Sequence, residues 1–207
     1  TFTDVVLERN GETFSTKVLT TYTAPENAIV DGMHQVCAKA GIHPSEIGQI
    51  IHGTTLATNA LIERRGAKTA LITTQGFRDV IEMRTESRFE QYDLNLNLPD
   101  PLLPRQMRFT VNERVNAKGE VLVDLDLDEV SRVVDQIADA GFESVAVGLL
   151  HSYLNPTHEQ AIRDVLAAKL PDVSISISSE VSPQMREYER FNTVVANAYI
   201  KPLMASY

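Results

Sequence analysis

The sequence predicts an α/β fold with a mixed sheet, and three observations carry that prediction. Two β-rich runs, 1–8 and 13–20, flank Asn10-Gly11, the dipeptide most typical of a β-hairpin. Further along the chain, strand-like runs alternate with helical stripes, which is the pattern of a parallel sheet. The run 145–150, VAVGLL, is apolar throughout, as expected of a strand that is buried on both faces. We therefore expect a sheet that is antiparallel at its start and parallel later.

The other elements follow from apolar periodicity and from turn residues. Pro25 and Gly41 mark the two ends of the first helix, and Asp126 can cap a later one with Glu129 three residues on. Ile50 and Ile51 indicate the end of a short buried strand. The full set of expected helices is 25–40, 56–66, 77–83, 126–141, one beginning at 156 and one beginning at 182, with further strands at 68–73 and 173–177.

Residues 84–106 differ from the rest in composition, being rich in Arg, Glu, Asn and Pro, with three prolines between 99 and 104. A loop of this length is usually functional or part of an excursion from the main domain. Two alternating stretches, 108–115 and 121–125, follow it around a Lys-Gly turn and predict a second hairpin. We interpret 84–125 as an insertion or flap.

Composition narrows the class of protein. The chain has 207 residues, 43% of them hydrophobic and 23% charged, as in ordinary globular proteins. A net charge of −9 argues against a nucleic-acid partner, because phosphate binding needs a basic face. No apolar run reaches the length of a membrane span and no signal peptide opens the chain, so we expect a cytoplasmic protein without a membrane partner. The single Cys37 lies on an apolar helical stripe and is interpreted as buried filler.

The stretch 49–66, QIIHGTTLATNALIERRG, is the part around which the chain is organised. A strand, a small polar loop (His52, Gly53, Thr54 and Thr55) and a helix follow one another. This arrangement aims free backbone N–H groups at an anion, and the two hydroxyls add donors. A plain capped helix start explains the same residues equally well, because Thr is a common N-cap. His52 is more often a satisfied structural histidine than a catalytic one.

A charged segment containing Arg78, Asp79, Glu82 and Arg84 follows the strand at 68–73. The segment is either a solvated helix face or, because it lies beyond the carboxyl end of a strand, part of a cleft. No P-loop, dinucleotide-binding glycine fingerprint, G-x-S-x-G motif or zinc pattern is present in the sequence.

Seven segments in collinear order carry a resemblance to a known family. They are TFTD at 1–4, HGTTLATNALIERRGAKTALITTQGFRDVIE at 52–82, YDL at 92–94, PLLPR at 101–105, ERV at 113–115, AVGLLHSYLNP at 146–156 and SSEVSPQMREYERFNTVVANAYIKP at 178–202. Together they resemble the hydantoinase A / 5-oxoprolinase family over nearly the whole chain. The region is also similar to the ATP-using subunits of acetone and acetophenone carboxylases.

The resemblance implies the N-terminal half of an actin-like ATPase with ribonuclease-H-like halves. Residues 1–178 would form the hydantoinase/oxoprolinase N-terminal domain, with 84–125 as its inserted flap. Residues 179–207 would form a helix that leads into a C-terminal half which this chain lacks. Members of the family carry an Asp-x-Gly-Gly-Thr phosphate loop in the opening hairpin, and of that loop only Thr1, Thr3 and Asp4 can be carried over.

The resemblance further implies an ATP-dependent hydrolase of cyclic amides, with ATP and Mg²⁺ as cofactors and a ring carbonyl that is phosphorylated to drive ring opening. This half is not expected to turn over ATP by itself. The residues that would carry the function fall into three groups: Asp4 and Thr55 in catalysis, Asp4 also on the metal; Thr1, Thr3, Gly53 and Thr54 on the phosphates; His52, Asn59, Asp79 and Arg84 on the substrate.

The implied partners are a hydantoin- or 5-oxoproline-type cyclic amide and a hydantoinase B-type subunit, separate or fused, within an oligomer. Two alternatives stay open. One is the ATP-using subunit of a ketone carboxylase. The other is a subunit-assembly module without activity of its own, for which the proline-rich segment 99–104 is the expected contact.

Overall fold

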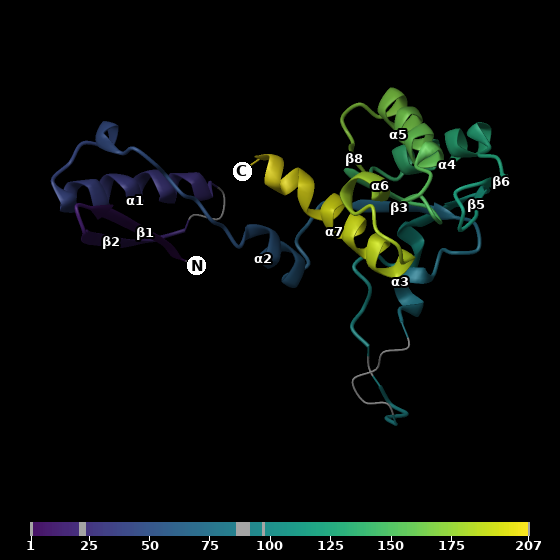
Figure 1. Ribbon diagram of the computed structural model, residues 1–207, viewed down its shortest axis with the longest axis horizontal. Coiled ribbons are helices and arrows are strands. Elements are labelled where there is room, and N and C mark those ends of the chain that lie inside the picture. The colour runs from purple at the N-terminus through teal and green to yellow at the C-terminus, as the bar shows by residue number, and fades with distance from the viewer. Residues whose placement is uncertain (1, 21–23, 86–91, 97, 207) are drawn as a thin grey trace. The chain divides into compact units, whose positions relative to one another are not determined.

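The computed structural model describes residues 2–20, 24–85, 92–96 and 98–206. The chain divides into two compact units, Thr1–Thr55 with Ser206–Tyr207, and Leu56–Ala205. Figure 1 shows the elements of each unit. None of the helices in the described part of the chain combines the length and apolar character needed to cross a bilayer.

The first unit is a β-hairpin with a helix packed on one face. Strands β1 (Phe2–Arg9) and β2 (Glu12–Leu19) are antiparallel, and Asn10 and Gly11 both have positive φ (52° and 84°) at the turn. Two central residues with positive φ are what a type I′ hairpin turn requires, so the Asn-Gly prediction is confirmed. Helix α1 (Pro25–Ala40) lies along the hairpin in Figure 1, and the short 3₁₀ helix η1 (Pro44–Glu46) follows.

Both ends of α1 are as the sequence predicts. Pro25 occupies the first turn, where a missing N–H costs nothing, and Gly41 caps the helix with a left-handed φ of 65°. Cys37 is 1% exposed on the face of α1 that packs on the hairpin, and its interpretation as buried filler is confirmed.

The second unit is built on a four-stranded parallel sheet in the order β4-β3-β7-β8. Its strands are β3 (Thr69–Thr74), β4 (Arg108–Val111), β7 (Ser144–Gly148) and β8 (Ser174–Ile177). A separate antiparallel hairpin pairs β5 (Arg114–Val115) with β6 (Val121–Val123). The antiparallel and parallel parts of the fold therefore form separate sheets among the described residues.

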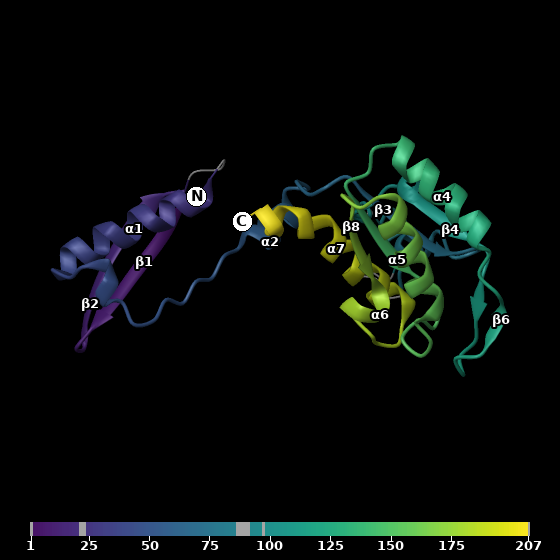
Figure 2. The same ribbon diagram turned by 90° about the horizontal axis from the view of Figure 1, so that it is seen from above.

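Helices cover both faces of this parallel sheet, as Figure 2 shows. On one face, alternate strand residues such as Ile72 and Val147 pack against α4 (Leu127–Asp139) and α5 (Thr157–Lys169). On the other face, Leu71 and Ala146 pack against α7 (Glu187–Ser206) and against Ile81 of the short helix α3 (Val80–Met83). Because successive strand residues point to opposite faces, both sets of apolar side chains are buried. The remaining helices are α2 (Leu56–Ile62), α6 (Ser178–Val181) and the 3₁₀ helix η2 (Arg105–Met107).

The predicted strand at Ile50 and Ile51 is wrong. Neither residue lies in a strand, and their side chains are 62% and 87% exposed. No described strand pairs with this segment. β-Branched residues favour a strand only where a neighbouring strand and a packing surface exist, so the local signal is not sufficient.

Helix α2 ends at Ile62, four residues earlier than predicted, and Arg64 caps it. The amides of Arg64 and Arg65 donate to the carbonyls of Leu61 (3.4 Å) and Ala60 (2.8 Å), and Arg64 has a left-handed φ of 57°. This is a Schellman motif with arginine at the usual glycine position. Gly66 serves another purpose, because a Cβ there would collide with the ring of Tyr199 on α7.

Two further boundaries differ from the predictions. Residues 108–111 belong to the central sheet as β4, so only β5 and β6 form the second hairpin of the interpreted flap. The last helix begins at Glu187 instead of Ser182. The two compact units also do not coincide with the ranges 1–178 and 179–207, because α7 packs on the second unit; the range of the family domain stays a prediction.

Candidate functional site

The predicted phosphate residues of the first strand point to opposite faces of the hairpin. Thr1 lies outside the described residues. Thr3 is half-buried on the face that carries α1, and its hydroxyl shares a hydrogen bond of 2.8 Å with that of Thr20. Asp4 is exposed on the opposite face, where its carboxylate lies 3.3 Å from the ammonium of Lys17, its cross-strand neighbour. A role for Thr3 and Asp4 on one phosphate group stays a prediction.

The polar loop lies at the carboxyl end of the first unit. His52, Gly53, Thr54 and Thr55 are all exposed and have no regular secondary structure, and α2 begins directly after them. A Cβ at Gly53 would meet no atom within 4 Å, so nothing in this structure requires glycine there. Asn59 lies half-buried on α2, in the second unit. The roles of these residues stay predictions.

Asp79 and Arg84, predicted to bind substrate, flank the short helix α3 and hold the segment that follows it. The Asp79 carboxylate accepts hydrogen bonds from Arg105 Nε (2.9 Å) and Nη2 (3.2 Å) and from Arg108 Nη1 (3.3 Å). The hydrogen bond from Arg105 holds the pKa of the Asp79 carboxyl below its ordinary value. Arg84 has a positive φ of 59° and donates to the carbonyl of Pro99. Both side chains thus have partners within their own unit, and substrate binding by them stays a prediction.

A buried polar cluster at the carboxyl ends of β3 and β7 was missed by the sequence reasoning. Glu113 is 1% exposed and accepts a hydrogen bond from the Thr74 hydroxyl. Its other oxygen lies 2.8 Å from Nδ1 of His158, and the Thr74 oxygen accepts the amide of Leu150 at 3.0 Å. The carboxylate therefore joins three elements in a place that water does not reach.

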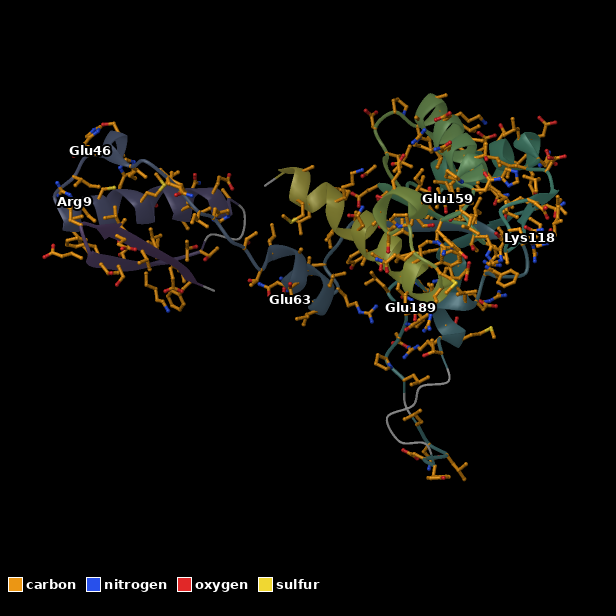
Figure 3. All side chains as sticks on the ribbon, in the orientation of Figure 1. Arg9, Glu46, Glu63, Lys118, Glu159 and Glu189 are labelled. Atoms are coloured by element: carbon orange, nitrogen blue, oxygen red, sulfur yellow. The ribbon has the colours of Figure 1, made fainter. Side chains whose placement is uncertain are left out.

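A second buried acid, Glu159, lies at the start of α5. Figure 3 shows it among the elements of the second unit. Its Oε1 accepts the Leu149 amide (2.9 Å) and the Ser178 hydroxyl (2.6 Å), and its Oε2 accepts the Ser179 amide (2.8 Å). The Ser178 oxygen in turn accepts Arg190 Nε at 3.1 Å. Arg190 is 1% exposed, so this charge is buried together with its partner Ser178.

Arg190 also ties α7 to the end of β7. Its Nη2 donates to the Leu149 carbonyl (2.8 Å) and to Glu187 (3.1 Å), and Glu187 accepts the His151 amide at 3.2 Å. Burial opposes ionisation of Glu187, but the His151 amide and the Arg190 charge outweigh it and hold the pKa of Glu187 below its ordinary value. His151 has a left-handed φ of 53°.

The signal that could have found this cluster is positional. Glu113 is the second residue after β4, and His158 and Glu159 lie in the first turn of the helix after β7, so all three lie beyond the carboxyl ends of parallel strands. Ligands of open α/β sheets bind at that edge. Burial, however, cannot be read from a single sequence, and a charged residue in the first turn of a helix is ordinarily exposed. In the described ranges, no group of three or more His, Cys, Asp or Glu side chains could hold a metal ion.

Comparison with known proteins identifies the class to which this fold and these residues belong. The profile of the hydantoinase/oxoprolinase N-terminal region matches residues 1–170. Caprolactamase subunit alpha of Pseudomonas jessenii is 35% identical over 100% of this chain and 31% of its own length. The gamma subunit of acetophenone carboxylase from Aromatoleum aromaticum is 31% identical over 99% of this chain and 30% of its own.

The solved structures agree with the sequence comparison. The crystal structure of the ATP-dependent caprolactamase from Pseudomonas jessenii superposes with a TM-score of 0.89, at 34% identity, over 100% of this chain and 31% of that chain. The chain belongs to the hydantoinase/oxoprolinase family, and the predicted family and α/β fold class are confirmed. It spans less than a third of the length of these relatives.

Proposed function

We propose that the chain contributes the N-terminal region of an ATP-dependent hydrolase that opens a cyclic amide. The observation that carries the proposal is the identity of 35% with caprolactamase subunit alpha, which extends over the whole of this chain. The superposition on the ATP-dependent caprolactamase, at a TM-score of 0.89, supports the same activity.

The chemistry explains why such a reaction needs ATP. The carbonyl carbon of an amide is a poor electrophile, and transfer of a phosphoryl group to the carbonyl oxygen turns that oxygen into part of a leaving group. Catalysis of phosphoryl transfer depends mainly on positioning and on charge neutralisation. In this proposal the hydroxyls of Thr54 and Thr55 donate to phosphate oxygens, and Gly53 lets the backbone approach them. His52 and Asn59 contact the substrate.

Mg²⁺ is compatible with the donor groups of the first strand. Magnesium sites commonly use one or two carboxylates together with substrate phosphates and waters. Asp4 supplies one exposed carboxylate, and its present partner Lys17 is held only in an exposed ion pair of 3.3 Å, which costs little to separate. We propose that Asp4 holds the ion, which would neutralise phosphate charge when bound.

Thr55→Val in the intact protein tests the role of the loop. The substitution keeps the shape of the side chain and removes its hydroxyl. We expect ATP-dependent turnover to fall by at least about tenfold, the low end for one lost transition-state hydrogen bond. Thr13→Val, on an exposed position of β2, is the matched control and should leave turnover unchanged. Equal turnover in both variants would remove Thr55 from the mechanism.

A ketone carboxylase subunit is the second candidate, favoured by the identity of 31% with the acetophenone carboxylase gamma subunit. ADP release separates the two candidates when it is measured with caprolactam, hydantoin and 5-oxoproline, and in parallel with acetone or acetophenone plus bicarbonate. Stimulation by a cyclic amide alone supports the hydrolase. Stimulation by a ketone with bicarbonate alone overturns it.

We also propose that the protein works with a B-type partner subunit, because two of the relatives are themselves named as subunits. A cytoplasmic location is proposed on the sequence features alone. An assembly role without catalysis remains the third candidate. The proline-rich segment 99–104 stays the proposed contact for it: Pro99, Asp100 and Pro104 are exposed, whereas Leu103 is 1% exposed and packs within the second unit. Capture of a B-type subunit by a variant that lacks ATPase activity would support the assembly role.

A further inference from the structure

A cleft of about 400 Å³ opens beside β4, the edge strand of the central sheet. It is lined by three arginines, Arg78, Arg108 and Arg132, and by a single acid, Glu129. These side chains come from the loop after β3, from β4 and from α4. The cleft therefore lies wholly within the second unit and carries an excess of positive charge.

The three arginines differ in how their charge is balanced. Arg108 is 1% exposed and pairs with Glu82 (2.8 Å) and Asp79 (3.3 Å), so its charge is neutralised inside the protein. Arg132 is 66% exposed, and its closest carboxylate, Asp126, lies 3.9 Å away. Such an exposed, long ion pair contributes little and leaves the guanidinium available.

Arg78 has an unused donor in a buried position. Its Nη2 donates to the Arg105 carbonyl at 3.0 Å, but its Nε is buried without a hydrogen-bond partner. Within the described residues Arg78 also forms no salt bridge, since none of those present includes it. Buried polar groups in folded proteins are nearly always hydrogen-bonded, so an orphaned guanidinium N–H beside a cleft indicates an absent acceptor.

The acid of the cleft does not fill this role. Glu129 Oε2 accepts the backbone amide of Asn112 at 2.7 Å, which engages it with the end of β4. The side-chain amide of Gln136 is a further hydrogen-bond donor, because Gln136 lies one turn beyond Arg132 on α4 and also lines the cleft.

We propose that this cleft binds a small oxyanion, a carboxylate or a phosphate, between Arg78 and Arg132. Guanidinium groups pair with both kinds of anion through parallel charge-assisted hydrogen bonds, and an ammonium cannot reproduce that geometry. Gln136 adds a neutral donor. The site uses none of the residues proposed for ATP, so it is a second ligand site that does not depend on the proposed activity.

Isothermal titration of the chain with inorganic phosphate and, separately, with malonate tests the site. Binding of either anion supports the proposal, and the anion that binds more tightly shows whether the site prefers a phosphate or a carboxylate. Arg78→Ala and Arg132→Ala should each weaken that binding about tenfold, the effect of losing one charge-assisted pair. Arg78→Lys should not restore it fully, because lysine lacks the planar fork.

Controls separate a specific site from general attraction. Arg163→Ala removes a guanidinium that is partly exposed on α5 and paired with Glu180 at 2.6 Å, and it should leave the affinity unchanged. Glu129→Gln should tighten binding several-fold by removing the one negative charge from the lining. Because Arg132 is largely exposed, its variant keeps the test valid even if Arg78→Ala does not fold. The proposal is wrong if neither anion binds, or if Arg163→Ala weakens binding as much as Arg132→Ala.

Discussion

Glu159→Ala should destabilise the second unit far more than an ordinary surface substitution. Glu159 is 0% exposed, and its carboxylate accepts the amides of Leu149 and Ser179 at 2.9 and 2.8 Å. Alanine leaves both amides buried without an acceptor. Each such donor costs about 1–3 kcal/mol, and we expect a total loss of about 3–5 kcal/mol. The Ser178 hydroxyl adds less, because it can rotate toward Ser152, 3.1 Å away.

A loss of this size is a large part of a typical folding free energy of about 5–15 kcal/mol. Urea unfolding followed by far-ultraviolet circular dichroism measures it. Hydrogen exchange of the β7 amides then assigns the loss to the second unit, because the chain has two compact units that can unfold separately.

Glu180→Ala is the matched control. Glu180 is 59% exposed and pairs with Arg163 at 2.6 Å, so its removal should cost no more than about 1 kcal/mol. The loss of stability for Glu159→Gln should fall between those of the two alanine variants. The glutamine NH₂ group would face one of the two amide N–H groups whose hydrogen bonds the carboxylate now accepts. A loss below about 1 kcal/mol for Glu159→Ala, equal to that of the control, would refute the view that this buried acid organises the end of the sheet.

Two further predictions concern neighbouring positions. A Cβ at Gly148 would lie 2.7 Å from Cδ1 of the fully buried Phe191. Gly148→Ala should therefore lower the free energy of unfolding, measured in urea, by about 1–3 kcal/mol. Gly48→Ala is the control and should be nearly neutral, because a Cβ at Gly48 would meet no atom within 4 Å. The folded pKa of Glu187 lies below its ordinary value of 4.5, so its ionised form stabilises the fold above that value and this contribution is lost as the pH falls through the folded pKa. Glu187→Gln should therefore flatten the decline of the urea midpoint below about pH 5, and the same change at the exposed Glu189 should leave the decline as it is.

Elements with strong local signals could be predicted from the sequence. Asn10-Gly11 specifies its hairpin because few other residues adopt two successive positive φ values at low cost. Of the apolar run at 145–150, residues 145–148 lie in β7, which is buried throughout, and Leu149 and Leu150 follow the strand. Asp126 caps α4 through the amides of Asp128 and Glu129. In the hairpin and in the helix cap the decisive interactions lie within a few residues of one another, and for β7 the apolar run is by itself typical of a buried strand.

Signals that depend on distant neighbours could not be read in the same way. Ile50 and Ile51 have the composition of a buried strand, but no described strand pairs with them. Gly66 has the position of a helix cap in the sequence. In the structure the ring of Tyr199, more than a hundred residues away along the chain, packs where a Cβ at position 66 would lie. The local sequence shows which conformations and contacts a residue can adopt. The residues that pack against it in the folded protein determine which of these it adopts.

The candidate site shows the same division. The sequence by itself determined the family, the α/β class and the polar loop at 52–55, because these depend on the order and identity of residues along the chain. Only the tertiary structure decided that Glu113, Glu159 and Arg190 are each buried and that Arg78 lines a cleft with an unused donor. The physical reason is that the burial of a charge depends on whether distant segments supply its hydrogen-bond partners, and that supply is settled only when the sheet and its helices have packed.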